Sequence, residues 1–586
     1  MPRHEPRRFG HVPPRVHRAW HREGQSLRLD RRCRCRPADA DRGGERPLDA
    51  GEHQARHLRR ARWRAALGGL LPLDRPRLCE LFAVSGAGGP AGSGQGGSGG
   101  PLSPTIPNAT RLAIALGMAA AVAAGIAWLP LSGEAGPLEL PAHRLASVIA
   151  AVVVLWVSET LPLPVTALAG AAACVVVGVA EAAEVFRPFS KPLIFLFIGS
   201  FMLAEAIRVH GLDRRLAYGV LARPWVGEHP GRLTAAVAVV CAVMSAVISN
   251  TATTAMMFAI VSGILVAIER AADGQPVGER VDPGFATGLL LVVAFASSIG
   301  GLATPIGTPP NLIGLAFIES QLEIDIPFFS WCALGLPLAA GLCVVIVVVV
   351  SLMFPAGVAR LSGVSQHVRR EQELLGGWTA GQISSGIAFA VTVALWVAPG
   401  LAAILWGKAD PRTSWLAERI PEGVAAIIGA VSLFVLPAGG GRRALSWREA
   451  AGIDWGVVLL YGGGMALGEL AFSTGLADAL GRSITGWIPQ GGGLPLIVAA
   501  AVVAALTSEF TSNTASANIV VPVALSLAVA VGADPLPAAL AATFAASLGF
   551  MMPVSTPCNA IVYGSGRVPL RAMVSAGAVL DLAGAI

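Results

Sequence analysis

Two short polar clusters interrupt long apolar runs of this sequence. Residues 245–254 contain the triplet Ser-Asn-Thr at 249–251, and residues 508–516 repeat that triplet at 512–514, 263 positions later. Polar groups at the depth of a bilayer are costly unless they are satisfied. One such cluster is typical of hydrogen bonding between helices, whereas two clusters at matched positions favour a binding site.

A break in a membrane helix at each triplet would create two kinds of binding group. The helix that starts there has free N–H groups, for which Ser, Asn and Thr are good caps. Its positive dipole end attracts a carboxylate. The unwound residues before it free carbonyl oxygens that suit Na⁺. Each triplet is therefore predicted to bind a cation and an anion together.

Two segments rich in glycine and proline follow the clusters. Residues 300–311 read GGLATPIGTPPN, and residues 552–566 read MPVSTPCNAIVYGSG. Proline removes a backbone donor and unseats a helical hydrogen bond, and glycine permits backbone shapes that other residues resist. Either segment alone is typical of a simple kink or loop. Their pairing with the two triplets favours ion-binding loops.

The charge of these segments narrows the ligand. The windows 245–258, 300–312, 508–520 and 549–566 contain no Lys, Arg or His, and their only charged residue is Glu509. A buried anion without a counter-charge is costly, so an anion bound here requires co-bound cations. This reasoning predicts sodium coupling. Glu509 itself is either a proton carrier or, as we favour, a structural group bonded to backbone N–H groups.

The elements that must position these residues are membrane helices. The chain is 54% hydrophobic and 14% charged, against about 25% charged in soluble proteins. Single spans are expected near 111–131, 144–161, 164–182, 327–354, 382–405, 422–438 and 569–586. Longer, interrupted runs cover 232–269, 284–318, 494–531 and 535–565.

The membrane body repeats itself. Besides the triplets, residues 193–216 resemble 457–480, which matches Glu205 with Glu469, and TPPN at 308–311 recurs as TPCN at 556–559. Repeats with breaks at equivalent positions indicate a secondary transporter. We expect four regions: a tail (1–110), the first span and first repeat (111–360), a connecting loop (361–381) and the second repeat (382–586).

The first 110 residues differ from the rest. They are rich in Arg, Gly and Pro and are predicted to be disordered. They are either a genuine basic arm or sequence upstream of a misassigned start. Arg before the first span favours a cytoplasmic N-terminus. The basic balance belongs to this tail, so nucleic-acid binding is not expected. No P-loop, HExxH, GxSxG or His/Cys metal motif indicates an enzyme.

Together these motifs resemble the divalent anion/sodium symporter family over residues 140–580. SNTATT at 249–254, SNTAS at 512–516, TPIGTPPN at 304–311 and PVSTPCN at 553–559 carry the resemblance. It implies an all-α membrane protein with about eleven transmembrane helices in two inverted repeats, each with a re-entrant hairpin and an unwound helix. It also implies a homodimer and elevator-type alternating access. The expected hairpins are 187–206 and 453–470.

The resemblance also implies site residues. The first sodium site would use Ser245, Asn250 and Gly307, and the second would use Ser508, Thr511, Asn513 and the backbone of Ser555. The substrate would contact Ser249, Asn250, Thr251, Thr308, Ser512, Asn513, Thr514, Thr556, Pro557 and Val562. Cys558 departs from the family pattern, which has a second proline there, and this puts the geometry of the second loop in doubt.

The expected function is import of small dicarboxylates (succinate, malate or fumarate) with sodium across the cell inner (plasma) membrane. Sodium is the co-transported ion, and no tightly bound cofactor is expected. Two alternatives stay open. One is a sodium-independent dicarboxylate exchanger, and the other is a sulfate or citrate transporter of the same fold. A membrane enzyme or channel is a third class, which the paired dual sites disfavour.

Overall fold

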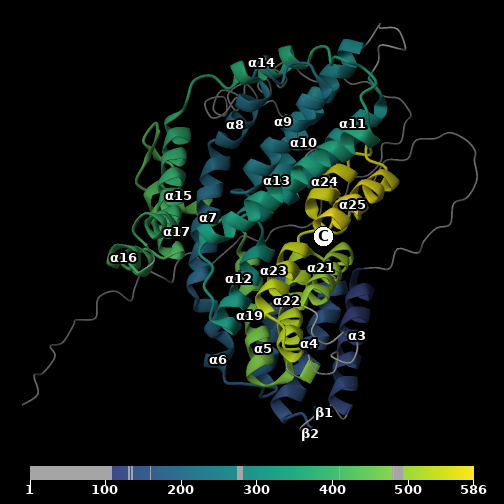
Figure 1. The fold of residues 1–586 in the computed structure, drawn as a ribbon, viewed down its shortest axis with the longest axis vertical. Coiled ribbons are helices and arrows are strands. Elements are labelled where there is room, and N and C mark those ends of the chain that lie inside the picture. Colours follow the sequence, from purple (N-terminus) through teal and green to yellow (C-terminus); the bar gives the residue numbers. More distant parts are fainter. Residues whose placement is uncertain are drawn as a thin grey trace, which may run out of the picture. The chain divides into compact units, whose positions relative to one another are not determined.

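The structure is a computed structural model that describes residues 108–129, 132–133, 136–158, 160–272, 281–407, 409–477, 479–480 and 493–585. All of them belong to one unit, Ser103–Ile586, and the described residues are almost wholly helical (Figure 1). The predicted tail lies outside the described residues up to position 107. The all-α fold expected from the sequence is confirmed.

The elements of the first half run from α3 to α13. They are α3 (Asn108–Trp128), β1 (Ser132–Gly133), β2 (Gly136–Pro137), α4 (Leu140–Ser158), α5 (Leu163–Val176), α6 (Ala182–Phe186), the 3₁₀ turn η2 (Arg187–Ser190), α7 (Pro192–Val209), α8 (Leu212–Leu221), α9 (Pro230–Ser245), α10 (Asn250–Ala272), α11 (Pro283–Gly300), η4 (Gly301–Ala303), α12 (Pro309–Leu322) and α13 (Phe328–Met353).

The second half runs from α14 to α25. Its elements are α14 (Val364–Leu374), α15 (Ala380–Trp406), α16 (Pro411–Arg419), α17 (Glu422–Leu433), β3 (Pro437–Gly439), β4 (Arg442–Arg443), α18 (Trp447–Ala450), α19 (Trp455–Ser473), α21 (Gly493–Phe510), α22 (Asn513–Ala530), α23 (Pro535–Ala545), α24 (Pro557–Tyr563) and α25 (Leu570–Ala585). The strands form two antiparallel pairs, β1 with β2 and β3 with β4.

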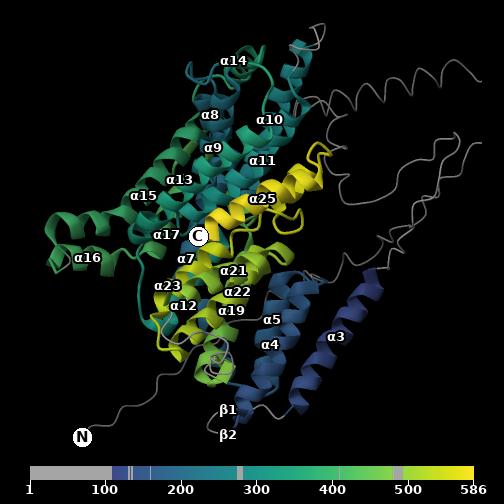
Figure 2. The same cartoon turned by 45° about the vertical axis from the view of Figure 1, so that its right-hand side comes forward.

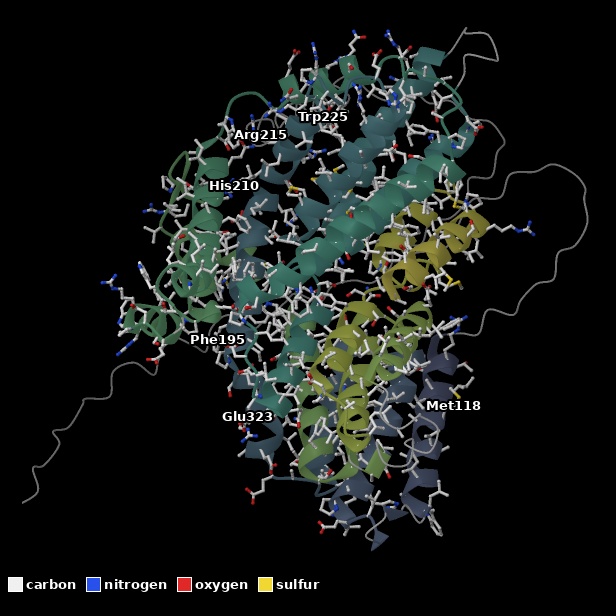
Figure 3. The ribbon with its side chains drawn as sticks, in the orientation of Figure 1. Met118, Phe195, His210, Arg215, Trp225 and Glu323 are labelled. Carbon is white, nitrogen blue, oxygen red and sulfur yellow. The ribbon has the colours of Figure 1, made fainter. Side chains whose placement is uncertain are left out.

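Helix length and composition fit a membrane. Among the described residues, 10 helices are long and apolar enough to cross a bilayer. Shorter apolar helices at α5, α9, α17 and α23 supplement them. The connecting loop contains the helix α14, and Arg215 of α8 donates to the carbonyl oxygens of Leu375 (2.9 Å) and Gly377 (2.8 Å) just after it (Figure 3).

The expected position of the hairpins is wrong. Residues 187–206 form η2 and most of the uninterrupted helix α7, and residues 453–470 lie almost entirely in the uninterrupted helix α19. The chain reverses instead at the two triplets. Helices α9 and α10 lie side by side (Figures 1 and 2). In the second half the Ser516 hydroxyl of α22 donates to Ala504 O of α21 (2.8 Å), which requires an antiparallel pair.

The unwound segments lie between two further pairs of helices. Residues 301–308 separate α11 from α12, and residues 546–556 separate α23 from α24. Proline occupies the first turn of α12 and of α24, where its missing N–H breaks no hydrogen bond. The glycine- and proline-rich motifs are therefore loops between helices, as the sequence predicts.

Several of the remaining long helices pack in pairs on one another. Helix α7 packs on α17, α5 packs on α19, and α3 packs on α4. Helices α3, α4 and α5 stay together in both ribbon views (Figures 1 and 2). The hairpin helices pack mainly on the helices that flank the unwound loops, as α9 does on α11 and α22 does on α12. We call α3, α4, α5, α7, α17 and α19 the frame helices. We call α9 to α12 and α21 to α24, together with the unwound loops between them, the loop-bearing helices.

Candidate functional site

A cavity of about 690 Å³ lies where the two triplets meet. Ligand pockets commonly measure about 300–1,000 Å³. The loop-bearing helices contribute Ile248, Ser249, Asn250, Thr251, Ala252, Ala255, Ser298, Ile306, Gly307, Thr308, Pro309, Ser512, Asn513, Thr514, Ser555, Thr556, Pro557 and Cys558 to its lining. The frame helices and the residues that join them contribute Leu163, Phe197, Phe201, Ala204, Glu205, Arg208, Gly452, Ile453, Asp454 and Val457. The cavity is therefore bounded by both packing groups.

Two helices begin at the triplets in the same way. The hydroxyl of Ser249 accepts the N–H of Ala252 (3.2 Å) at the start of α10. The hydroxyl of Ser512 accepts the N–H of Ala515 (3.2 Å) at the start of α22. Both serines are N-caps, and both helices present their positive dipole ends at the cavity. The helix starts that the sequence predicts at the two triplets are present in both repeats.

The first sodium site predicted from the sequence is a cluster of oxygen atoms. The hydroxyl of Ser245 lies 2.6 Å from the end of the Asn250 amide. That same end lies 3.2 Å from the carbonyl oxygens of both Ser297 and Gly307. The Asn250 amide can take two orientations. In the first, its nitrogen points to these groups and donates hydrogen bonds to them. In the second, its oxygen faces the two carbonyl oxygens with no proton between them. In the second orientation this cluster suits a monovalent cation.

The second predicted site also has more oxygen acceptors than hydrogen-bond donors. The hydroxyl of Ser508 lies 2.8 Å from Asn513 Oδ1 and 2.7 Å from Ala546 O. One hydroxyl carries a single proton, so one of these oxygen–oxygen contacts has no donor. Thr511, at the end of this hairpin arm, donates its own proton to Thr507 O (2.7 Å). A cation between these oxygens would balance them.

Each unwound loop is held by one asparagine. Asn311 Nδ2 donates to Gly301 O and to Thr304 O, both at 2.8 Å. Asn559 Nδ2 donates to Gly549 O and to Met552 O, both at 3.0 Å. Every residue of the second set lies 248 positions after its counterpart in the first. The repeat detected in the sequence is therefore also a repeat of side-chain contacts.

A glycine at the start of each loop allows it to approach the hairpin. A Cβ on Gly301 would lie 2.6 Å from Asn250 Oδ1. A Cβ on Gly549 would overlap the hydroxyl of Ser555 and lie 3.0 Å from Ser508 Oγ. A side chain at either position would fill the space in which the oxygens converge.

Glu509 is buried and hydrogen-bonded to the second loop. Its carboxylate oxygens accept the N–H groups of Met551 (2.8 Å) and Met552 (2.9 Å). These charge-assisted bonds join the hairpin end to the loop. The contacts agree with the structural role that the sequence favours for this residue.

The structure brings most of the predicted substrate residues together. The cavity is lined by Ser249, Asn250, Thr251, Thr308, Ser512, Asn513, Thr514, Thr556 and Pro557. Val562 is the exception, because it is fully buried in α24 and is not among the lining residues. Ser245 and Ser508 are also fully buried, behind the triplets. The two serines of the predicted cation sites therefore lie behind the cavity wall, whereas Asn250 and Asn513 belong both to these sites and to the lining.

Cys558 does not distort the second loop. It occupies the second position of α24, as Pro310 does in α12, and it is buried. Asn559, which follows Cys558, contacts the loop carbonyl equivalent to that contacted by Asn311, which follows Pro310. The doubt that the cysteine raised is resolved by these contacts.

Three charged cavity residues were not foreseen from the sequence. Asp454 caps α19 by accepting the N–H of Gly456 (3.0 Å). Glu205 and Arg208 form an ion pair on α7. In the sequence, Glu205 stands out only as the repeat partner of Glu469. The spacing of Glu205 and Arg208 does not indicate that these side chains face a cavity. No group of three His, Cys, Asp or Glu side chains suited to a metal ion occurs among the described residues.

The chain is similar to several known proteins. Residues 110–586 match the family described as the sodium:sulfate symporter transmembrane region. The sodium-dependent dicarboxylate transporter SdcS of Staphylococcus saprophyticus is 29% identical, over 73% of this chain and 81% of its own. An uncharacterized transporter of Haemophilus influenzae is 32% identical, over 76% and 90%. The solved structure of Neisseria gonorrhoeae MtrF, an antimetabolite efflux pump, aligns with a TM-score of 0.49 and 14% identity, over 83% and 95%.

Proposed function

Because the chain belongs to the sodium:sulfate symporter family, we propose that it imports small dicarboxylates such as succinate, malate and fumarate together with sodium ions. Family membership makes the chain a multi-pass membrane transporter rather than an enzyme. The resemblance to divalent anion/sodium symporters is thereby confirmed. The substrate, the coupling and the mechanism are our proposals.

The observation that carries the proposal is the shared cavity. Two helix N-termini, hydroxyl groups and an amide from each repeat converge on it, and this chemistry suits a small molecule with carboxylate groups. The relatives named sodium-dependent dicarboxylate transporters support the same substrate class. The chain covers 81% of the length of each of these two.

Sodium would supply the positive charge that the cavity lacks. The charged lining residues are Glu205, Arg208 and Asp454, which leave a net negative charge. A dicarboxylate would therefore enter against an unfavourable field. Sodium at the Ser245/Asn250 cluster and at the Ser508/Asn513 cluster would offset that field from directly behind the substrate. Binding of the ions would then favour binding of the anion.

We assign two cation sites and one substrate site to these residues. In the first cation site, Ser245, Asn250 and Gly307 are joined by the carbonyl oxygen of Ser297. The second cation site uses Ser508, Thr511, Asn513 and Ser555. The substrate ligands are the lining residues of the two triplets with Thr308, Thr556 and Pro557, and Val562 is omitted because of its burial.

We further propose that the loop-bearing helices move against the frame helices during transport. The cavity lies between the two groups, so their relative displacement would carry the substrate from one side of the membrane to the other. This is the elevator type of alternating access. We also propose a homodimer in the plasma membrane, formed through the frame helices.

The test is uptake of radiolabelled succinate by proteoliposomes that contain the full chain. An inward sodium gradient should drive accumulation, and replacement of sodium by potassium should abolish it. Counterflow of preloaded succinate without sodium would overturn the symport proposal in favour of exchange. Sodium-driven uptake of sulfate or citrate but not succinate would overturn the proposed substrate.

A further inference from the structure

A second buried acid lies beside the hairpin end of the second repeat. Asp581 of α25 is 9% exposed, and both of its carboxylate oxygens are shielded from solvent. Its side chain lies within hydrogen-bonding range of the side chain of Glu509, which is 1% exposed. The N–H of Phe550 lies near Asp581, but neither Asp581 oxygen accepts a hydrogen bond of normal distance and angle. The main partner of this buried acid is therefore another acid.

The packing of α25 on the second loop sets this position. A Cβ on Gly577 would lie 2.6 Å from Met551 N, whose N–H donates to the hairpin carboxylate. A Cβ on Gly584 would lie 2.6 Å from a methyl group of Leu548. Residues three and four positions apart share one face of a helix, so Asp581 stands between the two glycines on the face that contacts the loop.

Three helices that pack on α25 offer no counter-charge to the two acids. They are α13, α21 and α23, and none of them contains Lys, Arg or His. The loop at 546–556 contains none either. Arg571, in the first turn of α25, is exposed and precedes Asp581 by about three helical turns. Two ionised carboxylates in contact here would repel each other with no cation from these elements to balance them.

A proton shared by two acids turns this repulsion into a hydrogen bond. The two acids differ in their other partners. Glu509 accepts the N–H groups of Met551 (2.8 Å) and Met552 (2.9 Å), and such bonds stabilise the charged form of a carboxylate. Asp581 has no comparable bond. The negative charge is thus better placed on Glu509, and the proton on Asp581.

We propose that Asp581 is protonated, donates a hydrogen bond to Glu509 and thereby positions the second loop at the second cation site. This inference rests on the proposed function. Glu509 directly follows Ser508, whose hydroxyl lies 2.8 Å from Asn513 Oδ1. The Glu509 carboxylate joins its own hairpin arm to the loop and, through the Asp581 proton, to α25. Asp581 is a positioning residue, because it acts on sodium binding only through Glu509.

The first test is infrared spectroscopy of the purified full chain at neutral pH. A protonated carboxyl group has a carbonyl stretching band separate from the bands of carboxylates. Asp581→Asn should remove one such carboxyl band. Asp534→Asn is the matched control, because Asp534 is exposed and caps α23 through the N–H of Leu536 (3.0 Å); it should remove a carboxylate band instead. Loss of a carboxylate band in Asp581→Asn would overturn the inference.

The second test is sodium-driven uptake of radiolabelled succinate by proteoliposomes that contain Asp581→Asn or Asp581→Leu. Asparagine keeps a donor in nearly the same shape, so the sodium concentration for half-maximal uptake should stay within about twofold of wild type. Leucine is neutral but donates nothing, so that concentration should rise by about tenfold. The KM for succinate at saturating sodium should not change in either variant. Rescue by asparagine and not by leucine separates a hydrogen-bond donor from packing alone.

Four outcomes would overturn the inference. Equal loss in both variants, or a lower Hill coefficient for sodium in Asp581→Asn, would indicate an ionised Asp581 that binds a cation. Wild-type behaviour of Asp581→Leu would show that no donor is needed. Failure of Asp581→Asn to fold would contradict the role of a neutral donor of this shape. If only Asp581→Leu fails to fold, the infrared comparison decides. Absence of sodium-driven uptake by the wild-type chain would overturn the proposed function instead and leave the infrared test intact.

Discussion

The two repeats build the same junction between hairpin and loop, in which the loop donates and the hairpin accepts, but side chain and backbone are exchanged. In the first repeat, the side chain of Thr304 donates to the backbone carbonyl of Ala246. In the second, the backbone N–H of Met552 donates to the side chain of Glu509 (2.9 Å). Residues 246 and 509 are equivalent, as are 304 and 552. The contact has been retained while its chemistry has changed, which indicates that joining the loop to the hairpin is the essential property.

That exchange makes the second junction charged and the first neutral. The Glu509 carboxylate also accepts Met551 N–H, a bond without an equivalent at Ala246. The loops also differ at residues 307 and 555, where glycine in the first repeat corresponds to serine in the second. The Ser555 hydroxyl donates to Gly549 O (2.9 Å). The second site is thus the more rigidly bonded of the two.

The largest expected effect tests what the repeats share. Asn250→Ala and Asn513→Ala each remove the amide on which one oxygen cluster is centred. Sodium-driven succinate uptake should fall to background in both variants. A single symmetric size-exclusion peak for each purified variant would serve as the control for folding. Wild-type uptake by both variants would contradict the site assignment, and loss in only one would show that the two clusters are not equivalent.

The next effect tests the exchanged junction. Glu509→Gln weakens two hydrogen bonds to a charged group and should lower the unfolding free energy by about 2 kcal/mol. Thr304→Val removes one neutral bond and should lower it by about 1 kcal/mol. Thermal unfolding in detergent measures both, with sodium titration alongside. A larger loss in Thr304→Val would contradict the view that the charged junction is the stronger one.

A smaller effect separates the two cavity threonines. Thr556 Oγ1 accepts the N–H of Asn559 (3.1 Å) and caps α24, whereas the Thr308 side chain makes no capping bond to α12. Thr556→Ala should therefore lower stability by about 1 kcal/mol. Thr308→Ala should raise the KM for succinate without changing the unfolding temperature. Equal destabilisation by the two substitutions would remove this distinction.

The smallest effect concerns the one position where the loop sequences TPPN and TPCN differ. Cys558→Pro introduces the residue that Pro310 provides in the first repeat. Proline fits the first turn of a helix because no intrahelical bond needs its N–H. Uptake should stay within about twofold of wild type, since both loops already have the same asparagine contacts. A severe loss would show that the Cys558 thiol, which is among the lining residues, is itself needed for transport.

The sequence predicted the chemistry of the cavity better than the course of the chain. Ser, Asn and Thr within apolar runs, and Pro and Gly at matched spacings, are strong local signals, and most of the residues predicted from them line the cavity or, like Ser245 and Ser508, lie directly behind it. Whether the chain reverses at such a break or continues through it depends on tertiary packing. The predicted hairpins therefore fall on α7 and α19, ahead of the observed reversals at the triplets.

The glycine run of α19 shows how packing decides the course of the chain. Gly462, Gly463 and Gly464 suggest a break, yet the helix continues through them. Their lack of side chains serves close packing: a Cβ on Gly463 would lie 2.7 Å from the Cβ of Ala167 on α5. Packing of one helix on another is invisible in a local pattern. The same reason hid Arg208, whose orientation toward the cavity is set by the neighbours of α7.

The exchanged junction also bears on how the molecule arose. An internal repeat is the mark of duplication of an ancestral segment, after which the two copies diverge. Placing alanine at 509 would leave the N–H groups of Met551 and Met552 without an acceptor, and placing glutamate at 246 would bring a carboxylate against the Ala246–Thr304 contact. Neither half can therefore adopt the other's residue alone. Each half carries its own matched pair of hairpin and loop residues, so this junction can change only when both members of a pair change together within one half.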